Sequence, residues 1–476
     1  MSTQAKKPNV VVFFTDQQRW DCSSLHGNPL DLMPNFDRLA RQQTHLANCF
    51  TCQPVCGPAR SCLQTGQYAT TTGVWRNGFI LPTDRKNLAT CFNEAGYHTG
   101  YIGKWHLAGI KHNDRTGGGI VPKDKRGGYQ HWLGVEAMEF SRDEYRTILY
   151  DNDDNEVVLP GYRSDAVADA GIRYINEHQD EPFFLMMSFI EPHHQNDKDD
   201  YPAPDGYRER YTGKWTPPDL AALPAWSTTQ GQTDSPTYNV TGGTTQQHLG
   251  GYYGMVKRLD EGFGRICDTL KSLEIMDNTI VMFISDHGCH FKTRNAEYKR
   301  SCHESSIRVP SLLSGPGFEG KGSFPGVVSL VDLPPTLLDA CDIEIPETMQ
   351  GHSLMPVLRG QTRDWQEEIF VQISESGIGR AVRTKRWKYA VESITETEDG
   401  QGGASQYKEA FLYDLHHDPY ELCNLIECAS HEKVKTVMRE RLLRRMDEAG
   451  EAKPQIILVE NKPSGQRHVR DDEVML

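Results

Sequence analysis

Four short apolar runs, each followed at once by polar side chains, constrain the fold of this chain most strongly. The runs lie at residues 9–15, 99–102, 183–190 and 279–285, and three of them are rich in Val, Ile and Phe. Runs of this length and composition are typical of strands that are buried on both faces of a parallel sheet. Helical patterns alternate with them at residues 87–94, 164–178 and 246–273, and Ser164 is expected to cap the second. This order predicts an α/β fold with a doubly wound, mostly parallel sheet.

The pattern changes near residue 365. Strand-like segments follow one another at 369–374, 380–384, 387–391 and 410–415, and a helical pattern covers 431–449. We therefore expect a catalytic domain over residues 1–364 and a smaller C-terminal α+β subdomain over 365–476, with an antiparallel sheet and one covering helix. Residues 195–243 are rich in Pro, Gly, Thr and Asp, and are expected to form an irregular loop of the kind that often builds a substrate pocket.

Composition excludes some classes of partner. The formal net charge of -14 argues against a general binder of nucleic acid or of anionic membranes, because both need a basic surface. The first apolar run is too short for a signal peptide, and no run reaches the roughly 18 residues of a membrane span. Twelve cysteines spread over 476 residues suit reduced thiols. We expect a cytoplasmic protein, or a periplasmic or secreted one if a signal has been removed.

Each of the four apolar runs delivers chemically active side chains to its carboxyl end. The residues that follow the runs are, in order, Asp16-Gln17, Lys104 and His106, His193, and Asp286-His287. Ligands bind open parallel sheets at this edge. A polar residue can simply mark where one strand meets solvent, but four such ends together favour a functional site. The oxygen ligands of Asp16, Gln17 and Asp286 suit Ca²⁺, Mg²⁺ or Mn²⁺, and the imidazole of His287 favours Mn²⁺ or another transition ion.

The segment from Cys56 to Gly66 reads C-G-P-A-R-S-C-L-Q-T-G. Pro58 fits the first turn of a helix and Gly66 its end, so Cys56 is expected at a helix N-terminus, which favours a bound anion. Arg60 adds a cation one turn along. A thiolate metal site formed with Cys49 and Cys52 is the alternative, but the spacing is not that of a zinc ribbon.

The pattern Cys-x-Pro-x-Arg followed by Thr-Gly resembles the signature of the type I sulfatases, the formylglycine-dependent sulfatases of the alkaline-phosphatase superfamily. Further stretches of the chain resemble other markers of that family, at residues 103–107, 285–288, 299–310, 351–354 and 412–425. The resemblance covers nearly the whole chain and implies an alkaline-phosphatase-like α/β catalytic domain.

The resemblance also implies a mechanism. A separate formylglycine-generating enzyme would oxidise Cys56 to formylglycine, whose hydrated diol attacks sulfur and then expels sulfate through its second hydroxyl. Arg60 and Lys104 would hold the diol and the developing charge, and His106 would accept a proton. His193 and Lys299 would contact sulfate oxygens or assist the leaving group.

The implied metal site consists of Asp16, Gln17, Cys56, Asp286 and His287, with one divalent ion, Ca²⁺ as the first expectation and Mn²⁺ or Mg²⁺ as alternatives. Asn77 and His303 are candidate substrate contacts, although a solvent-facing role for His303 is equally open.

Three functions follow as hypotheses. The first is a sulfuric ester hydrolase acting on a sulfated carbohydrate or another alkyl sulfate, with a sulfated small molecule or saccharide as partner. The second is a phosphonate or phosphate ester hydrolase, because Asp16-Gln17 with His287 looks more like the phosphonate monoester hydrolases and choline-sulfatases of the superfamily. The third is a non-catalytic anion-binding homologue. A homo-oligomer is possible in each case.

Overall fold

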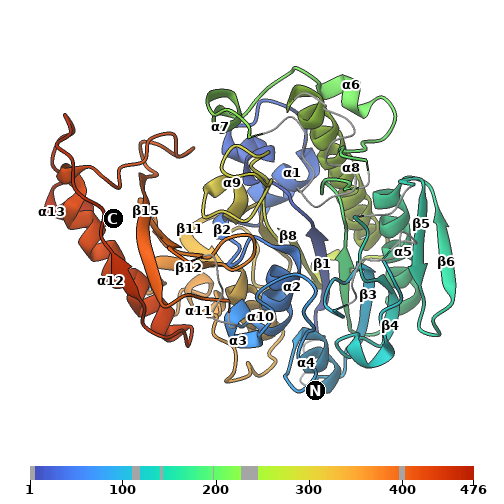
Figure 1. Cartoon of the computed structure of the whole chain (residues 1–476). Coiled ribbons are helices and arrows are strands. Elements are labelled where there is room, and N and C mark those ends of the chain that lie inside the picture. The colour runs from blue at the N-terminus through green and yellow to red at the C-terminus, as the bar shows by residue number, and fades with distance from the viewer. Residues whose placement is uncertain are drawn as a thin grey trace.

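A large mixed sheet forms the centre of the molecule (Figure 1). The computed structural model describes residues 6–109, 118–139, 143–196, 198–226, 245–395 and 402–475, without the side chains of 245–247. The strand order is β11-β2-β10-β8-β1-β7-β3-β4-β5-β6, and β9 pairs with β2. Five neighbouring strands in the middle run parallel: β8 (Thr279–Ser285), β1 (Asn9–Thr15), β7 (Phe183–Ser188), β3 (His98–Lys104) and β4 (His131–Val135).

Helices cover both faces of this sheet, and the central strand shows why. All seven residues of β1 are buried. Val10, Val12 and Phe14 pack in one core with α2 (Cys56–Thr65), α4 (Leu88–Glu94) and α10 (Leu333–Ala340). Val11 and Phe13 pack in a second core with α1 (Pro34–Gln42), α5 (Arg163–His178) and α8 (Thr245–Ser272). A strand between two apolar cores needs apolar side chains on both faces, so the predicted doubly wound α/β fold is confirmed.

The prediction of four strands was incomplete. Antiparallel pairs extend the sheet on both sides through β2 (Thr44–Phe50), β9 (Arg308–Val309), β10 (Leu312–Ser314), β5 (Arg146–Tyr150) and β6 (Glu156–Pro160), while β11 (Gly322–Ser329) runs parallel to β2. β9 and β10 are very short, β5 and β6 are partly exposed, and β11 is interrupted by Pro and Gly, so these strands lack the apolar run of a strand buried on both faces. β2 is mostly buried, but Thr44, His45 and Asn48 interrupt its apolar residues.

The C-terminal part forms a second sheet with the order β12-β13-β14-β15-β16, at the left of Figure 1. Its strands are β12 (Glu368–Ile373), β13 (Gly379–Thr384), β14 (Trp387–Ser393), β15 (Gln406–Asp414) and β16 (Gln455–Ile457); the first four are antiparallel and β16 is parallel to β15. Helix α12 (Glu432–Glu448) covers one face. Ile369, Val371 and Ala381 on the other face pack against Phe50 and Val327 of the large sheet. The predicted α+β subdomain is confirmed, and the boundary between residues 364 and 365 stays a prediction.

The structure differs from two local predictions. Helix α5 begins at Arg163 after an extended Tyr162, so Ser164 lies in the first turn and does not cap the helix. The expected irregular loop contains two short helices, α6 (Tyr207–Tyr211) and α7 (Pro218–Ala222), and residues 197 and 227–243 of it lie outside the described residues. In the described part of the chain, no helix combines the length and the apolarity that a membrane crossing needs.

Candidate active site

The carboxyl ends of the central strands meet at one edge, as the sequence predicts. Asp16 follows β1, Lys104 ends β3, His193 follows β7, and Asp286 and His287 follow β8, and all five are buried. The backbone at this edge is unusual. Gln17 and His106 have positive φ values of 65° and 60°, and a Cβ on Gly103 (φ 108°) would lie 2.0 Å from the Ser188 carbonyl oxygen. Strained positions of this kind cluster at functional sites.

Cys56 lies at the first residue of α2, and Gly66 ends that helix in a left-handed conformation, as predicted. The side chain of Asn77 accepts a hydrogen bond from the Gly57 N–H at 2.9 Å. Helix α2 therefore points its N-terminus toward the strand ends, and a polar side chain fixes its first turn. The described cysteines form no disulfide, and Cys56 is fully buried.

Asp16, Cys56, Asp286 and His287 form a compact group. One ligand atom from each lies within 4.8 Å of the others. The Cys56 sulfur is 3.5 Å from Asp16 Oδ1 and 3.3 Å from His287 Nε2. His287 Nδ1 lies 2.8 Å from the Gly288 carbonyl oxygen, which holds the proton on Nδ1 and leaves the Nε2 lone pair facing the group.

Three cations surround the same group. Lys299 Nζ lies 2.9 Å from the Cys56 sulfur. Arg60 donates to Asp16 Oδ2 at 2.9 Å, and Lys104 donates to the same oxygen at 2.8 Å. All three cations are buried, so the attraction that each exerts on a nearby anion is strengthened by the low dielectric constant of the interior. Such an arrangement suits a tetrahedral oxyanion.

The cations control the charge of the buried acids. Burial alone would raise the pKa of the Cys56 thiol, but Lys104, Lys299 and His287 hold it well below its usual value. Burial and Cys56 would also raise the pKa of Asp16, yet the neighbouring cations lower it. Burial, followed by the charge of Asp16, raises the pKa of Asp286 to about 7. Perturbed groups in one cluster are typical of catalytic sites.

Two histidines lie beside the group. His193 Nδ1 is 2.5 Å from the His194 carbonyl oxygen, so its Nε2 accepts from Lys299 at 3.3 Å. Burial and Lys299 lower the pKa of His193 to about 4, which keeps it neutral. One nitrogen of His106 lies within 4.8 Å of both the Cys56 sulfur and a Glu139 oxygen. The structure thus brings both predicted histidines next to Cys56.

Three other predicted residues lie outside the group formed by Asp16, Cys56, Asp286 and His287. The Gln17 side chain donates to the Tyr201 hydroxyl at 3.3 Å and to the Cys289 sulfur at 3.1 Å, and its carbonyl oxygen accepts from the His194 N–H at 3.4 Å. Asn77 holds the first turn of α2. His303 is buried, not solvent-facing, with Nε2 3.1 Å from the Tyr413 hydroxyl. A metal-binding role for Gln17, and substrate contacts for Asn77 and His303, stay predictions.

Two carboxylates of the site were missed. Glu139, after β4, forms an ion pair with Lys104, and its Oε1 lies 3.4 Å from His106 Nδ1. Lys104 and His106 overcome the effect of burial and hold the pKa of Glu139 well below its usual value. Glu139 follows a short apolar run at 131–135, the same signal that marked the other strand ends. Glu375, in the turn after β12, accepts from Arg300 at 2.7 Å and from the Asn77 N–H at 3.0 Å. No sequence pattern marks it.

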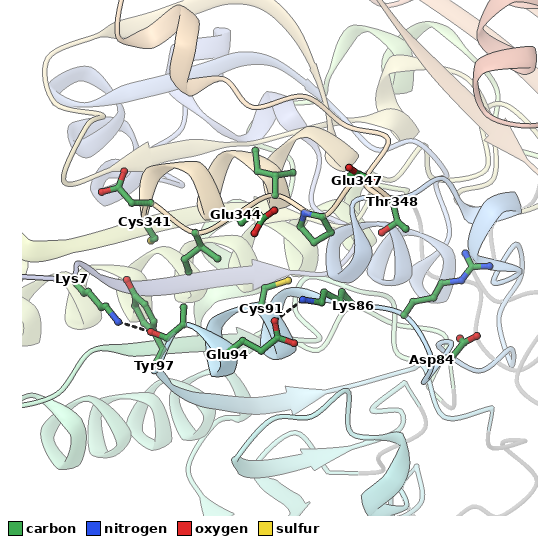
Figure 2. Close-up of a pocket in the computed structure, with 16 residues that line it drawn as sticks. Lys7, Asp84, Lys86, Cys91, Glu94, Tyr97, Cys341, Glu344, Glu347 and Thr348 are labelled. Atoms are coloured by element: carbon green, nitrogen blue, oxygen red, sulfur yellow. Dashed lines mark hydrogen bonds and ion pairs between the residues drawn. The ribbon is translucent and has the colours of Figure 1, made fainter.

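A hollow of about 720 Å³ lies elsewhere on the molecule, between α4 and residues 341–348 (Figure 2). Its basic side chains are already engaged. Lys86 pairs with Glu94 at 2.6 Å, and Lys7 donates to the Ala95 carbonyl at 2.5 Å. None of the residues around Cys56 lines it, so this hollow is separate from the candidate active site.

Comparison with known proteins identifies the family to which the chain belongs. The family model described as "Sulfatase" matches residues 8–343. The chain belongs to the sulfatase family. It is therefore a sulfatase, a hydrolase of the alkaline-phosphatase-like superfamily. A second family model, "N-sulphoglucosamine sulphohydrolase, C-terminal", matches residues 296–448.

Individual relatives extend this match over almost the whole sulfatase chain. It is 30% identical to an ulvan-active sulfatase of Formosa agariphila over 94% of this chain and 82% of that protein. An N-acetylglucosamine-6-O-sulfatase of Bacteroides thetaiotaomicron is 24% identical over 92% of this chain and 86% of its own. The solved structure of a phosphonate monoester hydrolase of Agrobacterium radiobacter is 25% identical with a TM-score of 0.70, covering 93% of this chain and 96% of that one. Family membership implies a metal and a formylglycine, and the buried group around Cys56 is consistent with both.

Proposed function

We propose that this sulfatase releases inorganic sulfate from a sulfated carbohydrate or another alkyl sulfate, with Cys56 converted to formylglycine as the nucleophile. The observation that carries the proposal is the convergence of Lys299 and His287 on the Cys56 sulfur, at 2.9 and 3.3 Å. A reactive group at this place lies at a helix N-terminus and within reach of a fixed cation. Both features stabilise an anionic sulfuryl group in the transition state.

The donor set fits one divalent metal. Asp16 and Asp286 offer carboxylate oxygens, His287 offers Nε2, and an oxygen on the modified Cys56 would complete a mostly oxygen-based set. Asp286 Oδ2 is a buried oxygen that accepts no hydrogen bond from the described residues. It lies 3.5 Å from Arg60 Nη2, which leaves it able to contact a metal ion as well. A bound ion would supply Lewis-acid stabilisation of the anionic ester. We propose Ca²⁺ first, with Mn²⁺ or Mg²⁺ as alternatives, and Gln17 as a further ligand.

The remaining roles follow from the hydrogen bonds. Asp16 holds both Arg60 and Lys104, so these two cations are fixed before the substrate arrives and cost no reorganisation during the reaction. Lys299 Nζ is placed to contact a sulfate oxygen. The contact of His193 Nδ1 with the His194 carbonyl oxygen makes Nε2 an acceptor. Donation to a leaving oxygen therefore requires a proton on Nε2, and Lys299 is the adjacent proton-bearing group.

His106 is proposed to accept the proton of the Cys56-derived hydroxyl during sulfate release. Glu139 lies 3.4 Å from its Nδ1 and can hold the proton on that nitrogen, which leaves Nε2 as the base. The arrangement of acid, imidazole and nucleophile is the one that activates nucleophiles in many hydrolases. Asn77 and His303 are proposed to contact the rest of the substrate.

A phosphonate or phosphate ester is the second candidate substrate. The likeness to the Agrobacterium radiobacter phosphonate monoester hydrolase supports it, because the chain shares its fold at 25% identity. The saccharide assignment is supported by the relative named N-acetylglucosamine-6-O-sulfatase. A non-catalytic homologue is disfavoured, because every charged residue of the predicted centre lies in the buried group or in contact with it. A homo-oligomer stays a prediction.

The deciding experiment compares matched sulfate and phosphonate esters, sulfated mono- and oligosaccharides included, on protein made with a formylglycine-generating enzyme. We expect faster turnover of the sulfates and, by peptide mass spectrometry, an aldehyde at Cys56. Cys56→Ala should abolish turnover, while Cys62→Ala, which removes a buried thiol from the same helix, should keep it. Full activity in Cys56→Ala, or in protein whose Cys56 remains a thiol, would refute the nucleophile. Faster turnover of the phosphonates would favour the second candidate.

A further inference from the structure

A buried arginine, Arg19, has no role in the proposed mechanism although it follows Asp16 closely in the chain. Its guanidinium is buried between two carboxylates. Asp21 accepts from Nε at 2.8 Å and from Nη2 at 2.7 Å, and Asp219 of α7 accepts from Nη1 at 3.0 Å and from Nη2 at 2.8 Å. Nη1 also donates to the Cys289 carbonyl oxygen at 2.8 Å. A guanidinium has five N–H donors, so every donor of Arg19 is used.

These hydrogen bonds join three segments that lie far apart in the chain. Arg19 belongs to the turn after β1, and Cys289 follows Asp286 and His287 after β8. Asp219 belongs to the long segment between β7 and α8, which the sequence predicts to build a substrate pocket. One guanidinium therefore holds both segments that carry the proposed metal ligands and connects them to that long segment.

Sheet pairing stops just short of the metal ligands. The register of β1 with β8 ends at Thr15 and Ser285, one residue before Asp16 and Asp286. Beyond this point the Gln17 N–H donates to Asp286 Oδ1 at 3.0 Å. The conformation of the turn after β1 therefore helps to set the position of a carboxylate that follows β8.

The turn after β1 is in turn held through Arg19. Gln17 has a positive φ of 65°, which is uncommon in a residue with a side chain and needs support from its surroundings. The Tyr252 hydroxyl, from α8, accepts from the Arg19 N–H at 2.7 Å and donates to the Gln17 carbonyl oxygen at 2.8 Å. A shift of Arg19 would therefore be transmitted to Gln17 and, through its N–H, to Asp286.

An ordinary buried ion pair explains less of this arrangement. Asp21 alone balances the charge of Arg19, and it lies only two residues away in the same turn. Asp219 is a second carboxylate, brought from a position 200 residues away. Burying a further charge costs free energy. The connection that Asp219 makes between α7 and the strand ends accounts for its presence.

We propose that Arg19 and Asp219 are positioning residues of the metal site. The guanidinium sets the separation between the segment that carries Asp16 and the segment that carries Asp286 and His287, and Asp219 fixes the guanidinium. This inference rests on the proposed metal site. Groups that orient metal ligands typically contribute about 10- to 100-fold to metal affinity. Because such coupling is reciprocal, a bound ion should also hold α7 in place.

Calorimetric titration of chelator-treated, full-length protein with Ca²⁺, and separately with Mn²⁺, tests the proposal. Asp219→Asn keeps the shape of the side chain but removes its charge, and should raise the Kd of the ion about 10- to 100-fold. Asp219→Glu keeps a carboxylate and should recover part of the affinity. Glu451→Gln is the matched control, because it removes the carboxylate from another buried arginine, Arg380 of the C-terminal sheet. It should lower the free energy of unfolding in urea and leave the Kd unchanged.

Hydrogen exchange followed by mass spectrometry gives a second readout, which does not depend on a variant. The ion that binds more tightly should slow exchange of the backbone amides of α7 in the parent, and should slow it less in Asp219→Asn. A role limited to stability would predict neither effect. An unchanged Kd in Asp219→Asn, an equal weakening in Glu451→Gln, or no effect of the ion on α7 in the parent would overturn the proposal. A parent that binds neither ion would refute the metal site itself.

Discussion

Glu375 and Arg300 form an ion pair with an Nη2–Oε1 distance of 2.7 Å that links the C-terminal sheet to the active site. Glu375 Oε2 also accepts from the Asn77 N–H, and Asn77 in turn holds the Gly57 N–H. Arg300 follows Lys299 directly, and Gly57 follows Cys56. One carboxylate of the C-terminal part therefore fixes the two segments that carry Cys56, the proposed nucleophile, and Lys299, the cation beside it.

Glu375→Ala is expected to misplace Cys56 and Lys299 relative to each other. Displacements of about 1 Å can cost about 10²-fold in rate, so we expect kcat to fall by about one to two orders of magnitude. Steady-state kinetics would show this, and the aldehyde content of Cys56 must be measured so that poor modification is not mistaken for poor turnover. Glu375→Gln should recover part of the loss, because its amide can still accept from Asn77. Glu440→Ala, at an exposed position of α12, is the control. A normal kcat in Glu375→Ala would contradict the link.

Glu139→Gln tests the carboxylate beside His106. The change removes the negative charge that pairs with Lys104 and lies 3.4 Å from His106 Nδ1. General base catalysis typically increases a reaction rate by about 10²–10⁴-fold. A base that loses its orienting group keeps part of this increase, so kcat should fall by about 10- to 100-fold. KM should change little, since the proposed role of Glu139 is to orient His106 and not to bind substrate. Glu94→Gln, on α4, should leave both constants unchanged. A rise in KM with normal kcat would argue that Glu139 contacts substrate instead.

Removal of the metal should abolish turnover and lower stability together. Without a metal ion, Asp16 and Asp286 lie close together in the interior, and burial, followed by the charge of Asp16, raises the pKa of Asp286 to about 7. An ion at 100 times its Kd stabilises the folded state by about 2.7 kcal/mol, so a chelator should lower the melting temperature by several degrees. Adding back Ca²⁺, Mn²⁺ or Mg²⁺ separately would identify the ion. Full activity in protein shown by elemental analysis to contain no metal would exclude the proposed site.

The sequence predicted the middle of the molecule better than its edges. Strand β1 is apolar at nearly every position because helices cover both of its faces, and that composition is readable without a structure. In strand β2, Thr44, His45 and Asn48 interrupt the apolar residues, and β11 contains Pro325, so neither strand is recognisable until it pairs with partners that lie far away in the chain. The same physics limits the prediction of the site. Residues at the ends of buried strands were found from their position.

Residues that act through tertiary contacts were not found. Glu375 is a single acidic residue in a turn, and its importance arises only when Arg300 and Asn77 meet there. Glu139 follows a run at 131–135 in which His131 and Gly134 interrupt the apolar residues, so the run was not assigned as a strand. Asn77 and His303 show the same limit. Both were expected near the substrate, but the sequence could not predict that they would contact Gly57 and Tyr413, respectively.

Acid stability should depend on Glu304, which joins α9 (Glu304–Ile307) to the C-terminal sheet. Its carboxylate is 3.2 Å from Arg383 and 2.9 Å from Lys388. Burial would raise the pKa of Glu304, but these two cations hold it below its ordinary value of 4.5. A carboxylate with a lowered pKa in the folded state contributes stability that is fully present above about pH 4.5 and is lost as the pH falls further.

Glu304→Gln should therefore lower the free energy of unfolding at pH 7 by about 3 kcal/mol, because buried Arg383 loses its carboxylate partner while Lys388 keeps Glu421. The difference between the variant and the parent should shrink below pH 4.5, where the parent loses the same charge by protonation. Urea unfolding at a series of pH values measures both effects. Glu367→Gln removes an exposed carboxylate that pairs with Arg441, and should cost at most about 1 kcal/mol at every pH. An equal decrease in the free energy of unfolding of Glu304→Gln at pH 3 and at pH 7 would contradict this prediction. It would show that the charge of Glu304 does not stabilise the contact of α9 with β13 and β14.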